Sequence, residues 1–156
     1  MLKLLLIILL FLCNTHGFSR GAPDWVCDGM EPFHLVNAQT SKMPYKISID
    51  KPKVKPGETV EIGIDGPYKG LIVEVRKGNK ASGSFVLNKT ENYFQTINCH
   101  GIKKSGLTHK NSAVKSNKTF LWKAPTVPGT YVVVVTIAKD GLIFWTKKPT
   151  ETITVV

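Results

Sequence analysis

The side chains of this sequence that are best suited to chemistry are its three cysteines and four histidines. A cysteine can act as a nucleophile, bind a metal ion or form a disulfide, and the redox state of its compartment decides among these roles. The first question is therefore where the protein works.

Residues 1–17 indicate the compartment. They combine a cation at Lys3, an apolar run over 4–12 and a small-residue exit that ends at Gly17, which is the pattern of a secretory signal peptide. We expect a secreted, extracellular protein whose mature part, residues 18–156, forms one domain. No later stretch approaches the roughly 20 consecutive apolar residues of a membrane span, so no transmembrane segment is expected after the leader.

Secretion constrains the role of the cysteines. Cys13 falls within the leader, and the remaining Cys27 and Cys99 form an even pair in a compartment where disulfides form and persist. We predict that these two residues are bonded to each other. On the chain-entropy account, closing a loop of about seventy residues stabilises a fold by roughly 4 kcal/mol.

Catalysis and metal binding are not indicated. His34, His100 and His109 lack a close partner at the spacing of zinc ligands, and the sequence holds no Gly-Xaa-Ser-Xaa-Gly turn or glycine-rich phosphate loop. Asp28 and Glu31 lie near His34, but acidic groups beside a disulfide-anchored turn are more often solvated or cap backbone amides, and His34 is expected to be packed. We predict no catalytic residue, no metal site and no cofactor.

Short β-rich runs separated by Gly, Pro, Asn and Lys turns dominate the mature chain, without sustained helical periodicity. Val60, Ile62 and Ile64 alternate with other residues, as in a half-buried antiparallel strand. Eight or nine strands are predicted, at 45–50, 59–65, 71–76, 84–87, 93–99, 119–123, 131–138, 142–146 and 150–156. An Asp-Gly pair at 140–141 predicts a tight hairpin, and Pro149 places the last strand at a sheet edge.

The residues Val127-Pro128-Gly129-Thr130-Tyr131 resemble the tyrosine corner of immunoglobulin-like sandwiches. In that motif the phenol hydroxyl bonds to backbone a few residues upstream. The alternative is that Tyr131 is only the first aromatic residue of its strand. We predict an all-β fold, an immunoglobulin-like antiparallel β-sandwich of eight or nine strands with one disulfide.

The chain is strongly basic. It carries 21 basic and 11 acidic residues, a net charge of +10. Because Lys3 is the only charge in the leader, the mature balance is 20 minus 11, or +9. Outside the cell such a surface meets sulfated glycans, lipopolysaccharide phosphates and teichoic acids, whereas nucleic acid is not an expected partner. Solubility alone also explains an excess of this size.

The candidate contact surface is the stretch 100–123, which holds no acidic residue and whose first part, 100–117, is expected to form a long polar loop. Loops between rigid strands commonly carry binding, although an ordinary solvated loop is the alternative. Leu107 and Phe120 are placed to meet an acyl chain. The candidate ligand-binding residues are Lys103, Lys104, Lys110, Lys115 and Lys118.

Two acceptor sequons for N-glycosylation follow the leader. They begin at Asn88 and Asn117, and both are expected in polar loops, as modification requires. A glycan on Asn117 would stand within the basic stretch and limit how closely a flat membrane approaches.

Landmarks spread along the chain resemble the reeler domain, the module at the front of reelin and spondins. The matching landmarks are Cys27 to His34, Gly66 to Gly70, Gly83 to Phe85, Cys99, Thr108-His109, Phe120 to Pro125, Gly129 and Phe144-Trp145. A single such domain behind a signal peptide resembles the insect putative defense proteins of the noduler type. That resemblance implies a role in innate immunity.

Two functions are therefore expected. The first is a secreted defense protein that binds microbial surface molecules, namely lipopolysaccharide, lipoteichoic acid or glucan, with antimicrobial or bacteria-aggregating activity. The second is an extracellular adhesion module that binds host sulfated glycans through the same lysines. The expected partners are anionic glycolipids or polysaccharides, and the sequence does not indicate an oligomeric state.

Overall fold

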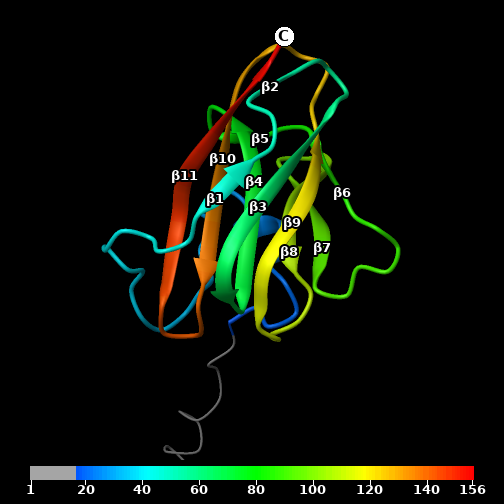
Figure 1. Cartoon of the computed structure of the whole chain (residues 1–156). Helices are drawn as coiled ribbons and strands as arrows, with labels where there is room; N and C mark the ends of the chain where they lie inside the picture. The colour runs from blue at the N-terminus through cyan, green and yellow to red at the C-terminus, as the bar shows by residue number, and fades with distance from the viewer. Residues whose placement is uncertain (1–16) are drawn as a thin grey trace, which may run out of the picture.

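The computed structural model describes residues 17–156. The predicted leader, apart from Gly17, lies outside the described residues. Two sheets face each other, and the C-terminus lies at the upper end of the view (Figure 1). The strand pairs are antiparallel except for a short parallel pair at Lys53–Val54 and Thr154–Val155. Among residues 17–156, no helix is long and apolar enough to cross a membrane.

Eleven strands follow one 3-10 turn, η1 (Asp24–Val26), in the described part of the chain. The strands are β1 (Ile47–Ile49), β2 (Lys53–Val54), β3 (Thr59–Tyr68), β4 (Gly70–Lys77), β5 (Lys80–Ala81), β6 (Ser84–Val86), β7 (Phe94–Cys99), β8 (Ile102–His109), β9 (Lys115–Lys123), β10 (Gly129–Ala138) and β11 (Phe144–Val155).

The strands form a four-stranded and a seven-stranded sheet. The first has the order β1-β3-β9-β6, and the second has the order β2-β11-β10-β4-β8-β7, with β5 paired to β4. Alternate residues of β3, β4, β9 and β10 point between the sheets, where Trp122, Tyr131 and Val133 are buried in the main core. The prediction of an all-β sandwich is confirmed.

The tyrosine corner is present. The hydroxyl of Tyr131 donates a hydrogen bond of 2.6 Å to the carbonyl of Val127. The phenol body packs in the main core against Trp122, with ring centroids 5.9 Å apart. This partly buried bond fixes the entry of the chain into β10.

Three local expectations were wrong. The predicted polar loop over 100–117 is largely strand, because β8 occupies Ile102–His109 and β9 begins at Lys115. The runs 142–146 and 150–156 belong to one strand, β11, in which Pro149 is tolerated because β2 pairs only with Thr154 and Val155. The β10–β11 connection spans residues 139–143 rather than a two-residue turn.

The N-terminal segment, residues 17–46, adds a partial third layer. Its only regular element is η1. Val26, Cys27 and Met30 are buried in a second hydrophobic cluster together with Ile72 and Val134. Because Ile72 and Val134 lie on the outer face of the seven-stranded sheet, the N-terminal segment covers that face.

Candidate functional site

The N-terminal segment is held to the seven-stranded sheet by hydrogen bonds to sheet side chains. Thr108 Oγ1 accepts from the N–H of Ala22 (3.0 Å) and donates to the carbonyl of Leu71 (2.8 Å). Thr136 Oγ1 donates to the carbonyl of Met30 (2.8 Å). The bonds to Ala22 and Met30 each satisfy a backbone group of a segment that has no strand partner of its own.

Arg76 and Glu74 form a buried ion pair beneath the N-terminal segment. Their side chains are 3% and 0% exposed, and Nε of Arg76 lies 2.8 Å from Oε2 of Glu74. The guanidinium also donates to the carbonyl of Cys27. Burial raises the pKa of Glu74, while the hydrogen bond and charge of Arg76 act in the opposite direction.

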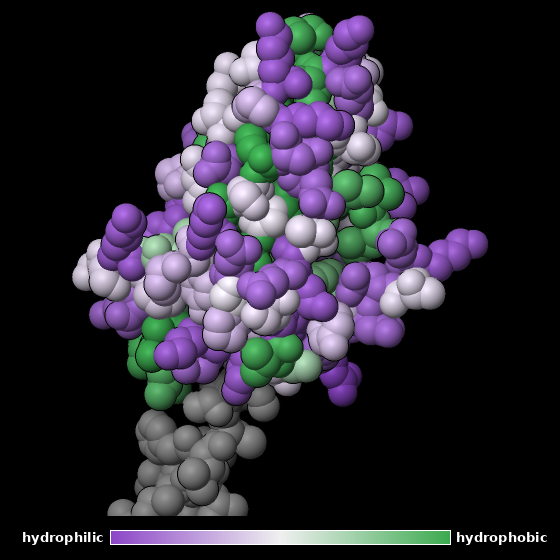
Figure 2. Space-filling view, viewed as in Figure 1, coloured by the Kyte–Doolittle hydropathy of each residue, from purple (hydrophilic) through white to green (hydrophobic). Residues whose placement is uncertain are grey.

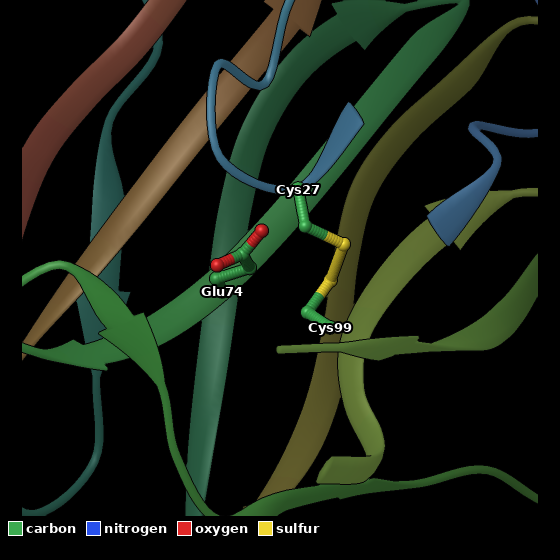
Figure 3. Close-up of side chains that lie close together, drawn as sticks. All are labelled: Cys27, Glu74 and Cys99. Carbon is green, nitrogen blue, oxygen red and sulfur yellow. A yellow bond between two sulfur atoms is a disulfide. The ribbon is translucent and has the colours of Figure 1, made fainter. Parts of the chain in front are cut away.

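The disulfide adds a covalent attachment. The sulfur atoms of Cys27 and Cys99 are 2.04 Å apart, and Gly106 leaves room for the bridge because a Cβ there would lie 2.7 Å from Cys99 Sγ. Figure 3 shows Glu74 beside the two sulfur atoms, in a group whose candidate ligand atoms lie within 4.8 Å of one another. With the sulfurs bonded to each other, neither is a thiolate, so this group does not have the donor set of a metal site.

His109 joins the first residues of the N-terminal segment to the sheet. Its Nδ1 accepts from the N–H of Leu71 (3.1 Å), so Nε2 carries the proton and donates to the carbonyl of Phe18 (2.6 Å). Burial lowers the pKa of His109, opposed by these backbone bonds and assisted by nearby Lys115. A neutral ring is the form that satisfies both partners.

A cavity of about 470 Å³ lies between the N-terminal segment and the sheet. The irregular segment is anchored at separate points, so its side chains do not interdigitate with the sheet as paired strands would. The floor comes from β4 and β10, and the roof from the N-terminal segment. Floor residues include Leu71, Ile72, Thr136 and Ala138, and roof residues include Phe18, Ala22, Val26, Met30 and Phe33.

Exposed apolar side chains surround the cavity mouth. Leu35 is 81% exposed, Leu142 67% and Phe33 58%, and all three line the cavity. Phe33 also belongs to an edge-to-face trio with Phe18 and Trp25, whose ring centroids lie 5.0–5.9 Å apart. Figure 2 shows groups of hydrophobic side chains among hydrophilic ones at the lower end of the molecule.

The predicted lysines do not form one surface. Lys103 and Lys104 are exposed near the start of β8, whereas Lys110 follows its far end. At about 3.3 Å per residue, Lys104 and Lys110 are separated by roughly 20 Å. Lys118 lies on the other sheet, with its Nζ 4.4 Å from the centroid of the Tyr93 ring.

Lys115 is not a surface residue, so its assignment as a ligand contact was wrong. It is 1% exposed, and its ammonium donates to the carbonyls of Lys69 (2.9 Å), Asn111 (2.6 Å) and Ala113 (2.6 Å). Burial lowers its pKa. The side chain holds the β8–β9 connection against the β3–β4 turn.

The prediction that Leu107 and Phe120 contact an acyl chain was also wrong, because both are buried in the main core.

The acidic residues near His34 do not form a cluster with it. Asp28 accepts from His100 (3.0 Å), while His34 packs edge-on to Phe144 and lines the cavity. Burial lowers the pKa of His34.

The two sequon asparagines are exposed. Asn88 lies in the connection between β6 and β7, as predicted, but Asn117 lies within β9 rather than in a loop. Oδ1 of Asn117 accepts from the N–H of Gly66 (3.0 Å) at a register shift between β3 and β9. Carbohydrate attaches to the amide nitrogen, which this bond leaves available.

Together these features define a disulfide-bonded β-sandwich with an N-terminal cover over one sheet. The chain belongs to the Reeler domain family, since residues 25–156 match the Reeler domain. It is 32% identical over 154 residues to putative defense protein 2 of Antheraea mylitta, covering 93% of this chain and 95% of that protein. It is 34% identical over 143 residues to putative defense protein Hdd11 of Hyphantria cunea, covering 86% of each.

Among solved structures, the human F-spondin reeler domain superposes with a TM-score of 0.57 at 14% identity, covering 79% of this chain and 95% of that domain. This likeness shows the fold. The resemblance to reeler domains and to insect defense proteins, inferred from the landmarks along the sequence, is confirmed.

Proposed function

We propose that this protein is a secreted defense protein that binds anionic surface molecules of microbes, lipopolysaccharide and lipoteichoic acid first among them. The observation that carries the proposal is its match to named putative defense proteins over nearly the full length of both partners. The relatives that share this extent are named for defense and not for a reaction. Binding, rather than catalysis, is the activity that this chain would contribute.

The charge of the chain supports an anionic ligand. The mature net charge of 20 minus 11, or +9, raises the local concentration of polyanions and speeds encounter with them. Exposed lysines stand at the upper end of the sandwich, around the turns next to β2, β4, β5 and β9. These are Lys51, Lys53, Lys55, Lys77, Lys80 and Lys123.

The decisive experiment compares ligands and salt. Purified protein is applied to immobilised lipopolysaccharide, lipoteichoic acid and heparin between low and high ionic strength. The proposal expects retention on the microbial ligands at salt concentrations that release heparin, because contacts other than screened charge then contribute. Retention on heparin alone would support the adhesion module instead.

Charge-reversal variants locate the surface. A variant with Lys51, Lys53 and Lys55 all changed to Glu tests the upper end. A second variant with Lys103, Lys104 and Lys110 changed to Glu tests the residues predicted from the sequence. Lys115 is left unchanged because its ammonium is structural. Unaltered binding by both folded variants would exclude these lysines as the contact.

A further inference from the structure

The cavity beneath the N-terminal segment has the size of a small-molecule site. Its volume of about 470 Å³ lies within the range of roughly 300–1,000 Å³ found for such sites. At about 30 Å³ for a group of the size of a water molecule, the space holds roughly sixteen carbons.

The polar groups of its lining are mostly engaged by the protein. Thr136 Oγ1 donates to the carbonyl of Met30 and accepts from the N–H of Lys147. Both ring nitrogens of His109 are bonded to backbone. Among the buried side-chain atoms of this lining, Nδ1 of His34 is the exception, because it has no partner among residues 17–156. Such an interior offers few groups to a sugar or a phosphate, and favours an alkyl chain.

The mouth has a different character. Exposed Leu35 and Leu142 flank it, and Lys69 contributes a cation to its lining. Glu31 and Asp140 also line it, but the Asp140 carboxylate accepts from the N–H groups of Leu142 (2.8 Å) and Ile143 (2.9 Å). Among the described residues, Lys69 is the one lysine or arginine in this lining, so it is the side chain that would meet an anionic headgroup.

We propose that this cavity binds one acyl chain of an anionic amphiphile, with the headgroup beside Lys69 and the chain between β4, β10 and the N-terminal segment. The inference deepens the proposed function and rests on it for the microbial source of the lipid. One acyl chain would contact both the cavity and its apolar rim, since an acyl chain that leaves the mouth passes over Leu35 and Leu142.

Chain length is the first test. Calorimetric titration with n-alkyl phosphates of about six to twenty carbons, below their micelle concentrations, should show affinity rising about fourfold for each methylene buried. The rise should stop at roughly sixteen carbons, where the cavity is full. Affinity that is absent, or that rises without a limit, overturns the proposal.

Variants of cavity and rim residues test whether the acyl chain binds in this cavity. Ala138→Phe fills the floor, and Leu35→Ser with Leu142→Ser removes the apolar rim. Each should weaken dodecyl phosphate binding at least tenfold, whereas Val127→Ser, a 56% exposed apolar residue at the other end of β10, should leave it unchanged. The rim variants alter exposed side chains, so they decide the matter even if Ala138→Phe does not fold. Equal losses in Val127→Ser would mean nonspecific adsorption.

The headgroup position has its own pair of variants. Lys69→Glu should weaken dodecyl phosphate binding severalfold and dodecanol binding little. Lys80→Glu is the control, because it makes the same charge change far from the cavity.

Intact and deacylated lipoteichoic acid then separate the two proposals. If the deacylated polymer binds and alkyl phosphates do not, the cavity inference fails and the proposed function stands. If alkyl phosphates bind, and neither form of lipoteichoic acid nor lipopolysaccharide does, the proposed function fails and the acyl-chain site stands.

Discussion

The buried ion pair gives the sharpest test of how the N-terminal segment is held. Changing Arg76 to Met keeps the side-chain volume and removes the charge. Glu74, which is 0% exposed, then loses its cation, and its Oε1 already has no partner in the described part of the chain. Removing one member of a buried pair costs about 3–5 kcal/mol, or roughly 10–15 °C in melting temperature for a domain of this size.

The pH dependence of that loss identifies its cause. Burial raises the folded-state pKa of Glu74 above its ordinary value of 4.5. Its contribution to stability is therefore fully present below 4.5 and declines as the pH rises through the folded-state pKa. Without Arg76 this decline is steeper, because the charged carboxylate has lost the cation at 2.8 Å from its Oε2. The deficit of Arg76→Met should be small near pH 4 and complete by pH 7.

Urea unfolding followed by tryptophan fluorescence from pH 4 to pH 7.5 measures this deficit. The double variant Glu74→Leu, Arg76→Met should recover the part of the loss that comes from the unpaired carboxylate. It should not recover the charged hydrogen bond to the Cys27 carbonyl, worth about 1.5–3 kcal/mol. Lys80→Met, on an exposed residue of neighbouring β5, is the matched control and should change little. A loss in Arg76→Met that is independent of pH, or is not recovered in the double variant, would refute the account of an unpaired buried carboxylate.

Three further outcomes are expected. Changing Cys27 and Cys99 to Ser should cost about 4 kcal/mol for a bridge that spans 72 residues, and should expose 17–46 to limited proteolysis. Equal protease resistance would show that the hydrogen bonds suffice. Because burial lowers the folded-state pKa of His109, stability should fall as the pH drops below 6.5, and the melting temperature of His109→Gln should vary less over that range. Mass spectrometry after glycosidase treatment should detect carbohydrate at Asn88 and Asn117, and an unshifted peptide would contradict the assignment for that residue.

The sequence predicted the parts of the fold that depend on local pattern. Alternation of Val60, Ile62 and Ile64 specifies one inward face, and the structure buries all three. The tyrosine corner at Tyr131 was predicted because its bond joins residues four apart. Such features depend only on residues that are close together in the sequence, so a single sequence is enough to predict them.

The outer face of the seven-stranded sheet was missed for the opposite reason. Ile72, Glu74 and Arg76 alternate with core residues, and taken alone that pattern indicates a face turned to solvent. They are buried because the N-terminal segment returns to cover them from far along the sequence. Ser105, Gly106 and Thr108 give β8 a polar composition for the same reason, since small side chains make room for the disulfide and for Ala22. One feature of the sequence does indicate that this face is covered. Glu74 and Arg76 carry opposite charges two residues apart within a largely apolar strand.

Lys115 shows how charge counting fails. A lysine in an acid-free stretch indicates a surface cation, yet three backbone carbonyls converge on this ammonium. Those carbonyls belong to two turns that meet only in the folded chain. The residues 100–123 alone do not indicate that these two turns come into contact. The basic stretch was therefore interpreted as one surface, whereas its lysines are divided among both sheets and the interior.

The same long-range cover explains why the cavity lies outside the sandwich core. Between the sheets, complementary strands interdigitate and leave Trp122 and Tyr131 fully enclosed. Over the outer face, one irregular segment is attached at Phe18, Ala22, Cys27 and Met30, by bonds that fix its backbone but leave space beneath its side chains. The cavity therefore exists only while these attachments hold. It follows that variants which detach the N-terminal segment should lose acyl-chain binding together with stability. Variants of the exposed rim residues should lose acyl-chain binding alone.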